Sequence, residues 1–304
     1  MSSGFKESFQ SELSKASNSG DTPEPDFIHK MFDELSPHAA KRAGISITDF
    51  KNRFKGLRVV KTIDINGCTF SNDEWKTFEV DIYEGLMIFI HKYFKVIVSM
   101  LNTSRSYKGE IETPSLTMDD IVPIANMIME LYWKNNVLQA QGIKLTKLTE
   151  GQMILNTELV HNAELFVLAH ELGHIILNTN KNAQRYIELS SGNASSDQLS
   201  NWNEEVNADI LGLKLCLEMK STRPGVVFNA IELFFLVQGM LVKFYEKTNA
   251  GNSLSHETHP PSSYRLRVLR SFVDQSGASE WLVIGKQFEE LCDSILDKVL
   301  CLHK

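Results

Sequence analysis

The pentapeptide His170-Glu171-Leu172-Gly173-His174 constrains this chain more than any other segment. The five residues before it are all apolar, and apolar residues recur at helical spacing over residues 146–178. On a helix, positions i and i+4 lie one turn apart on the same face, so both imidazoles leave the helix in one direction. Two neutral imidazole nitrogens at this spacing can reach one zinc ion at about 2.0–2.1 Å. The segment therefore predicts a buried helix that carries two metal ligands, His170 and His174.

Glu171 lies next to the first of these histidines on the same predicted helix. A carboxylate at this position can reach a metal-activated water and act as a general base. The alternative interpretation of the pentapeptide is a core helix with two half-buried histidines. A third ligand downstream favours the metal site over that alternative.

A catalytic zinc site uses three protein ligands and keeps a fourth position open. Downstream of the histidines, Glu205 and Asp209 are again at i and i+4 on one face of a predicted helix. Glu205 can complete a ligand set of two histidines and one glutamate. Asp209 can accept a hydrogen bond from the outer nitrogen of a ligating histidine, which fixes its tautomer.

Glu204 is the rival for the third ligand. Glu205 is preferred because only Glu205 has a carboxylate, Asp209, one turn further along the predicted helix. The alternative for the whole segment is an ordinary acidic helix start, since Asp and Glu favour the first turn of a helix. The two histidines upstream favour the metal site.

Together, residues 170–174 (HELGH) and 205–209 (EVNAD) resemble the HExxH and ExxAD motifs of gluzincin zinc metallopeptidases. A third segment, residues 258–265 (THPPSSYR), is similar to one found in the HtpX-like heat-shock proteases and the CAAX prenyl proteases. These families carry a His-Pro-Pro sequence with an Arg six residues after the His. The resemblance spans residues 170–265 and implies a zincin-like catalytic domain with Zn²⁺ as its cofactor.

The resemblance also implies that His259 or Arg265 enters the active site and helps to stabilise the tetrahedral oxyanion. A cationic donor aimed at developing negative charge is what that step needs. The alternative is that Pro260 and Pro261 begin a helix whose solvated side carries Arg265.

This sequence lacks the clear membrane-spanning helices of those relatives. Its two most apolar segments, residues 85–101 and 226–242, both contain polar or charged residues. The second falls short of about 18 uninterrupted apolar residues. Both are predicted to be core helices, which indicates a soluble member without stable membrane insertion.

The fold class predicted for the chain is mainly α with a small β-sheet (α+β), with the zincin-like active-site helix at residues 146–178. Residues 58–67 alternate, are rich in β-branched side chains and end in Asn66-Gly67, which is typical of a β-hairpin. Three regions are expected: a flexible leader over 1–24, a mostly helical region with the hairpin over 25–140, and a zincin-like metallopeptidase domain over 141–304. Residues 181–199 are expected to be mostly loop. The other helices are expected over residues 25–43, 78–101, 118–137, 202–219, 260–273 and 280–302 and from Pro224 onward.

Charge and cysteine usage limit the partners and the compartment. The net charge is −7 without a cluster of Lys or Arg, so nucleic acid is not an expected partner. The four cysteines are far apart and form no CxxC pair, and the first residues lack the apolar core of a signal peptide. A reducing compartment and a cytoplasmic location are therefore expected.

The function that these features predict is a zinc-dependent endopeptidase that acts on a protein or peptide. The alternative is a regulatory zinc-binding protein with a metallopeptidase scaffold, which turns over little until a partner opens its cleft. The N-terminal region is the expected surface for such a partner. The intact Glu171 favours the enzyme.

Overall fold

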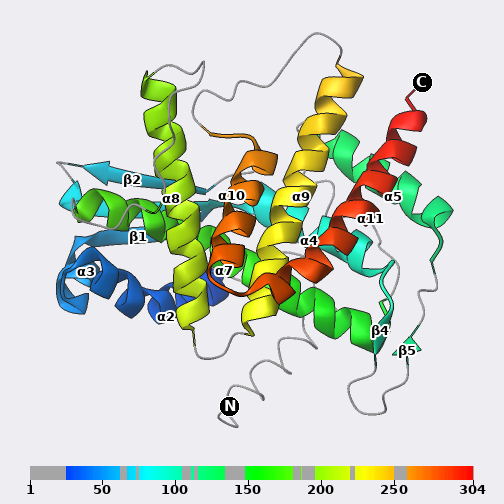
Figure 1. Cartoon of the computed structure of the whole chain (residues 1–304). Coiled ribbons are helices and arrows are strands. Elements are labelled where there is room, and N and C mark those ends of the chain that lie inside the picture. The colour runs from blue at the N-terminus through cyan, green and yellow to red at the C-terminus, as the bar shows by residue number, and fades with distance from the viewer. Residues whose placement is uncertain are drawn as a thin grey trace.

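The computed structural model describes residues 25–61, 67–72, 75–104, 111–112, 116–133, 148–180, 186, 196–219, 223–249 and 259–303. The described part is mostly helical with one small three-stranded sheet and one short strand pair, so the predicted α+β class is confirmed (Figure 1). The helices are α2 (Pro25–Ala43), α3 (Ile47–Arg53), α4 (Glu84–Val98), α5 (Met118–Trp133), α7 (Glu150–Thr179), α8 (Ser196–Glu218), α9 (Pro224–Thr248), α10 (Ser262–Gln275), η2 (Ser279–Trp281) and α11 (Leu282–Cys301). The strands are β1 (Phe54–Val60), β2 (Gly67–Asn72), β3 (Thr77–Tyr83), β4 (Thr103–Ser104) and β5 (Ile111–Glu112).

Helix α7 lies at the centre of the fold and packs against α2, α4, α8, α9 and β2 (Figure 1). A capping box between Thr149 and Gln152 begins it, because each side chain accepts a hydrogen bond from the other residue's backbone N–H. Nearly every residue of α7 from Leu159 to Leu177 is buried. A helix that is covered on all sides is a core helix, so the predicted buried helix is confirmed.

The sheet has the order β1-β3-β2, with β3 parallel to β1 and antiparallel to β2. The hairpin predicted at Asn66-Gly67 is therefore wrong, because β3 lies between β1 and β2, the two strands that this turn was expected to join. Asn66 itself lies outside the described residues. The antiparallel neighbours in sequence are β2 and β3. Strand β2 lies at the edge of the described sheet and packs against α7.

The helix predicted over residues 78–101 begins only at Glu84, because its first turns are strand β3. Phe78, Val80 and Ile82 alternate along β3 and are almost completely buried. Their spacing of two residues matches a strand, whereas the apolar residues that follow continue at helical spacing.

Helix α8 begins at Ser196, earlier than the predicted residue 202, so the expected loop ends sooner. The remainder of that loop, residues 181–185 and 187–195, lies outside the described residues, as do the leader 1–24 and the boundary near residue 140. The buried apolar residues on both sides of that boundary form one hydrophobic cluster. The division into 25–140 and 141–304 stays a prediction.

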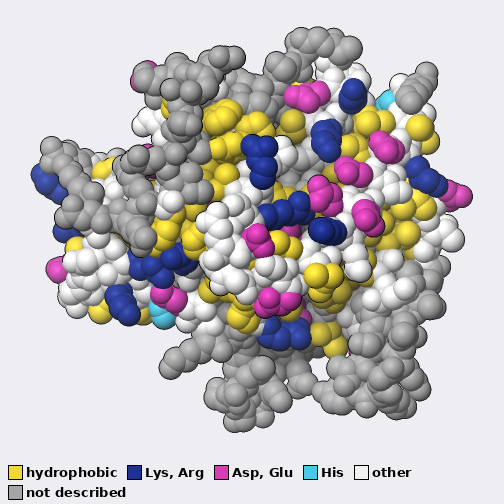
Figure 2. Space-filling model, in the orientation of Figure 1, with side chains coloured by type: hydrophobic (Ala, Val, Ile, Leu, Met, Phe, Trp, Pro, Cys, Tyr) yellow, Lys and Arg dark blue, Asp and Glu magenta, His cyan; other side chains and the backbone are white. Residues whose placement is uncertain are grey.

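Helix α9 is the one described helix that is long and apolar enough to cross a membrane. Of its most apolar window, 67% is buried inside the protein, as in the core helix of a soluble protein. Its Lys243 forms an ion pair with Asp293 of α11. Figure 2 shows Lys and Arg interleaved with Asp and Glu on the face over α9, α10 and α11.

Candidate metal centre

Helices α7 and α8 approach one another closely enough for their backbones to touch. A methyl group at Gly173 would lie 2.8 Å from the carbonyl oxygen of Ala208, and one at Gly212 would lie 3.0 Å from the backbone nitrogen of His170. A methyl group at Gly173 would force the backbones apart, and one at Gly212 would require the backbone of α7 to give by a few tenths of an ångström, so glycine at both positions favours this approach. The contact brings Glu205 of α8 close to the histidines of α7. The glycine within HELGH, Gly173, therefore allows the two helices to pack at this distance.

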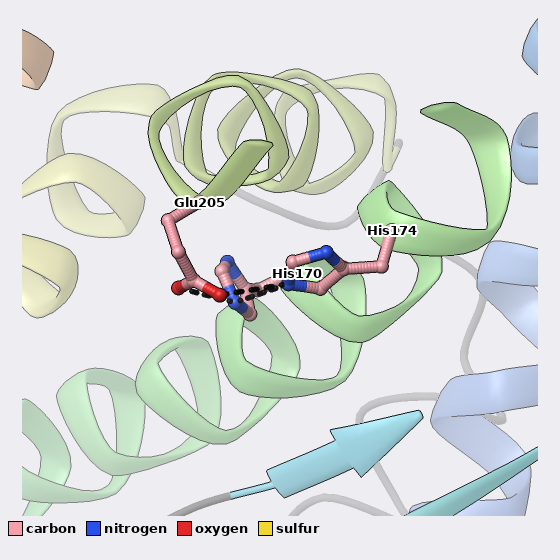
Figure 3. A group of neighbouring side chains, drawn as sticks. All are labelled: His170, His174 and Glu205. Atoms are coloured by element: carbon pink, nitrogen blue, oxygen red, sulfur yellow. Dashed lines mark hydrogen bonds and ion pairs between the residues drawn. The ribbon is translucent and has the colours of Figure 1, made fainter. Parts of the chain in front are cut away.

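The side chains of His170, His174 and Glu205 converge between the two helices (Figure 3). The Nε2 atoms of the two histidines are 3.2 Å apart. Glu205 Oε2 lies 3.6 Å from His170 Nε2, and Glu205 Oε1 lies 3.4 Å from His174 Nε2. Four ligands placed tetrahedrally at 2.0–2.1 Å from an ion lie about 3.3–3.4 Å from one another. The three donor groups therefore fit a zinc ion.

Two further observations fit a cation at this point. Glu205 Oε2 is buried and accepts no hydrogen bond from any described residue. Burial by itself lowers the pKa of His174, but its contacts with Glu204 and Glu205 outweigh burial and raise the pKa to about 10. The carboxylates thus strongly favour positive charge between them, which a divalent ion would supply.

The outer nitrogen of each histidine faces a carboxylate. His170 Nδ1 lies 2.9 Å from Asp209 Oδ1, and His174 Nδ1 lies 3.0 Å from Glu204 Oε1. Such carboxylates hold the proton on Nδ1 and leave Nε2 to bind a metal. From the sequence, Glu204 is only a rival for the third ligand, and its contact with the outer nitrogen of His174 is not predicted. The sequence feature that could have indicated this contact is the position of Glu204 directly before Glu205. Neighbouring residues point about 100° apart around a helix, so the two carboxylates approach the histidines from different directions.

Arg265 of α10 makes two hydrogen bonds to Asp209: its Nε donates to Oδ2 at 2.7 Å and its Nη2 donates to Oδ1 at 2.5 Å. Burial raises the pKa of the Asp209 carboxyl, but the Arg265 guanidinium outweighs burial and holds that pKa below its usual range. The Arg265 side chain is only 11% exposed, so it does not lie on the solvated side of α10. Its Nη1 also lies 3.4 Å from Glu205 Oε2.

His259 approaches the same carboxylate from the segment before α10. Its Nε2 lies 3.4 Å from Glu205 Oε1, while its side chain is 46% exposed. Burial of part of the ring lowers the pKa of His259, and the nearby Arg265 lowers it further against the opposing effect of Glu205. The structure thus brings both His259 and Arg265 to the candidate ligand, one facing solvent and one buried.

Glu171 is buried at 4% exposure and points to the sheet. The Thr69 hydroxyl on β2 donates a hydrogen bond of 2.7 Å to Glu171 Oε2. Thr69 is not predicted from the sequence, and no local pattern indicates it, because the contact joins residues 102 positions apart.

A family model described as Peptidase U49 matches residues 90–284, which is more than half of the chain. The matched span begins within α4 and contains the seven side chains proposed for the site from sequence. It does not include β2. No curated protein and no solved structure matches the chain.

Proposed function

Because this chain belongs to the peptidase U49 family, we propose that it is a zinc-dependent endopeptidase that hydrolyses peptide bonds in a protein or peptide. The proposed ligands are His170, His174 and Glu205, and the proposed general base is Glu171. The observation that carries the zinc is the ligand triad, whose donor atoms have the spacing of a tetrahedral site. The family supports peptidase activity, and the triad supports the metal.

Bound zinc would act as a Lewis acid towards the scissile carbonyl and would lower the pKa of a water molecule. Glu171 accepts the proton of the attacking water and passes it to the leaving amine, so one carboxylate serves both steps. Asp209 and Glu204 keep the two imidazoles in the tautomer that binds metal.

The geometry favours different roles for His259 and Arg265. Arg265 is buried and directs two of its nitrogens at Asp209, which suits a residue that positions Asp209 and His170. His259 is half-exposed and reaches the outer side of Glu205. We assign the oxyanion contact to His259, because its ring can reach a substrate without breaking a buried ion pair.

His259→Ala is expected to lower kcat by about 10²–10³-fold, while KM and zinc content stay close to their original values. The assay is mass spectrometry of a proteome-derived peptide mixture, followed by kinetics on one peptide that the unmodified protein cleaves. His29→Ala, at an exposed position of α2, is the control and should leave both constants unchanged. An unchanged kcat in His259→Ala would remove His259 from the reaction.

Asp209→Asn is expected to weaken zinc binding by about 10–100-fold, because Asp209 orients His170. It should also lower the free energy of unfolding by about 3 kcal/mol, since the buried Arg265 loses the closer of its two carboxylate partners and keeps only Glu205. Isothermal titration with zinc and chemical denaturation measure the two effects. Asp293→Asn removes a half-exposed carboxylate and is the control, with a change in unfolding free energy of at most about 1 kcal/mol. Equal zinc affinity in the two variants would contradict the role of Asp209.

The surroundings of β2 support an extended peptide as the substrate. Strand β2 is an edge strand among the described strands and lies against α7 at Glu171. An exposed edge can bind a peptide through backbone hydrogen bonds, with alternate side chains selecting the sequence. Phe70 on this strand is 47% exposed and is available for such a contact.

We further propose a place for the chain among the zinc peptidases. The contacts of His259 and Arg265 with Glu205 support a zincin-like fold in the branch of the HtpX-like and CAAX prenyl proteases. The burial of α9 supports a soluble member, and four free cysteines support a cytoplasmic location.

A partner-gated protein with little activity of its own is the second candidate. It is supported by the contact between β2, which belongs to the N-terminal region, and the proposed base Glu171. A partner that moved β2 would move the carboxylate. Cleavage of the peptide mixture by the purified chain alone would argue against this candidate.

A further inference from the structure

We propose that strand β2 positions the general base: Thr69 holds one oxygen of the Glu171 carboxylate, and Gly67 leaves the space that the other oxygen occupies. The inference rests on the proposed function, because it assigns a role to β2 only if Glu171 is the base. It makes Thr69 and Gly67 positioning residues and extends the active site into the N-terminal region.

The Thr69 hydroxyl fixes Glu171 from one side. Its Oγ1 lies 2.7 Å from Glu171 Oε2 and 3.2 Å from the Glu171 backbone oxygen. A buried carboxylate needs such a donor, because burial without a hydrogen bond is unfavourable. With Oε2 bound to Thr69, we assign the transferred proton to Oε1.

Gly67 defines the place of that second oxygen. A methyl group at Gly67 would lie 2.9 Å from Glu171 Oε1 and 3.3 Å from its Cδ and Cγ. No carbon at the Cβ position tolerates such a contact without a shift. The neighbour that would shift is the end of a side chain and not the backbone of α7, so a larger residue would displace the carboxylate and leave the fold intact.

The pairing of β2 with β3 holds both residues in register. Thr69 pairs with Val80 and Gly67 pairs with Ile82. Val80 and Ile82 are completely buried, so β3 cannot turn over without exposing them. Because a slip of one residue would turn Thr69 to the opposite face of the sheet, the buried face of β3 determines the position of the base.

The decisive comparison is between Gly67→Ala and Gly56→Ala. Both glycines lie in strands of the same sheet, and neither has the left-handed backbone conformation that would itself resist alanine. A methyl group at Gly56 would meet nothing within 4 Å. We expect Gly67→Ala to lower kcat by about 10–100-fold, since a small misplacement of a reacting group has effects of this size. Gly56→Ala should cleave normally, and both variants should keep their Tm and their zinc.

A second pair of variants tests the hydroxyl. Thr69→Val keeps the shape but removes the donor, and we expect about a tenfold lower kcat with unchanged KM, the size expected for a hydrogen bond to a charged group. Thr69→Ser keeps the donor and should restore most of the rate. If Gly67→Ala loses stability, the two Thr69 variants alone decide whether β2 positions the base. Valine keeps the packing of the strand without the hydroxyl, and serine keeps the hydroxyl with less packing.

The outcomes distinguish this inference from the proposed function. Normal kcat in both Gly67→Ala and Thr69→Val, with Glu171→Gln inactive, would overturn the role of β2 and leave the peptidase intact. An equal loss in Thr69→Ser and Thr69→Val would also overturn it, since the hydroxyl would then not matter. Normal cleavage by Glu171→Gln would instead reject Glu171 as the base.

Discussion

Glu171→Gln is expected to lower cleavage of the peptide mixture by about 10²–10⁴-fold, the usual contribution of a general base, while one zinc per chain stays bound. The amide has nearly the shape of the carboxylate and can still contact Thr69, but it cannot accept the proton of the attacking water. Glu171 is not one of the three donors that converge between α7 and α8, so the ligand set is unchanged. The cleavage rate on one peptide checks the loss of activity, and elemental analysis of the same sample checks that zinc stays bound.

Glu158→Gln is the matched control for this experiment. Glu158 lies on the same helix but forms an ion pair with Arg223 at the surface, well before the site in sequence. Exposed ion pairs contribute at most about 1 kcal/mol to stability, so its rate should be close to that of the unmodified protein. If Glu171→Gln retained the original rate, the proposed mechanism would be wrong even with zinc bound.

Glu205→Gln is expected to weaken zinc binding by more than about 100-fold and to remove peptidase activity with it. The substitution removes one of three protein ligands, whereas loss of an outer partner costs only about 10–100-fold. Glu204→Gln provides that comparison, because Glu204 contacts only the outer nitrogen of His174 within the site. Zinc titration of both variants gives the order of the two effects.

The reverse order, with zinc lost in Glu204→Gln and kept in Glu205→Gln, would make Glu204 the ligand. The observed distances argue against that exchange. Glu205 oxygens lie 3.4 and 3.6 Å from the inner nitrogens of the two histidines, whereas Glu204 faces the opposite nitrogen of His174.

The features predicted well from the sequence are those that depend on neighbours along one helix. Two histidines at i and i+4 share a face in any helix, and so do Glu205 and Asp209. The dense apolar residues around HELGH likewise require burial whatever the rest of the fold is. These local relations were sufficient to predict helix α7 and the grouping of side chains on α7 and α8.

The features that were missed depend on contacts between distant segments. The Asn66-Gly67 pair indicates a turn, but nothing local shows that β3 inserts between β1 and β2. The start of β3 was assigned to the following helix, because short apolar runs suit both structures. The contact between Thr69 and Glu171 depends on the register of that sheet and could not be predicted without it.

His259 and Arg265 are an intermediate case. Their approach to the site was expected only from the resemblance of the His-Pro-Pro segment to two protease families. Their separation into a half-exposed and a buried residue needed the packing of α10 against α8. The sequence alone leaves the roles of both residues open.

Anomalous diffraction at the zinc edge, from crystals of protein purified without a chelator, locates the metal and its ligands. We expect one peak per chain, at about 2.0–2.2 Å from His170 Nε2, His174 Nε2 and one Glu205 oxygen, with a fourth position open. No peak at this point, or a peak elsewhere with Glu205 turned away from the histidines, would contradict the proposed zinc site.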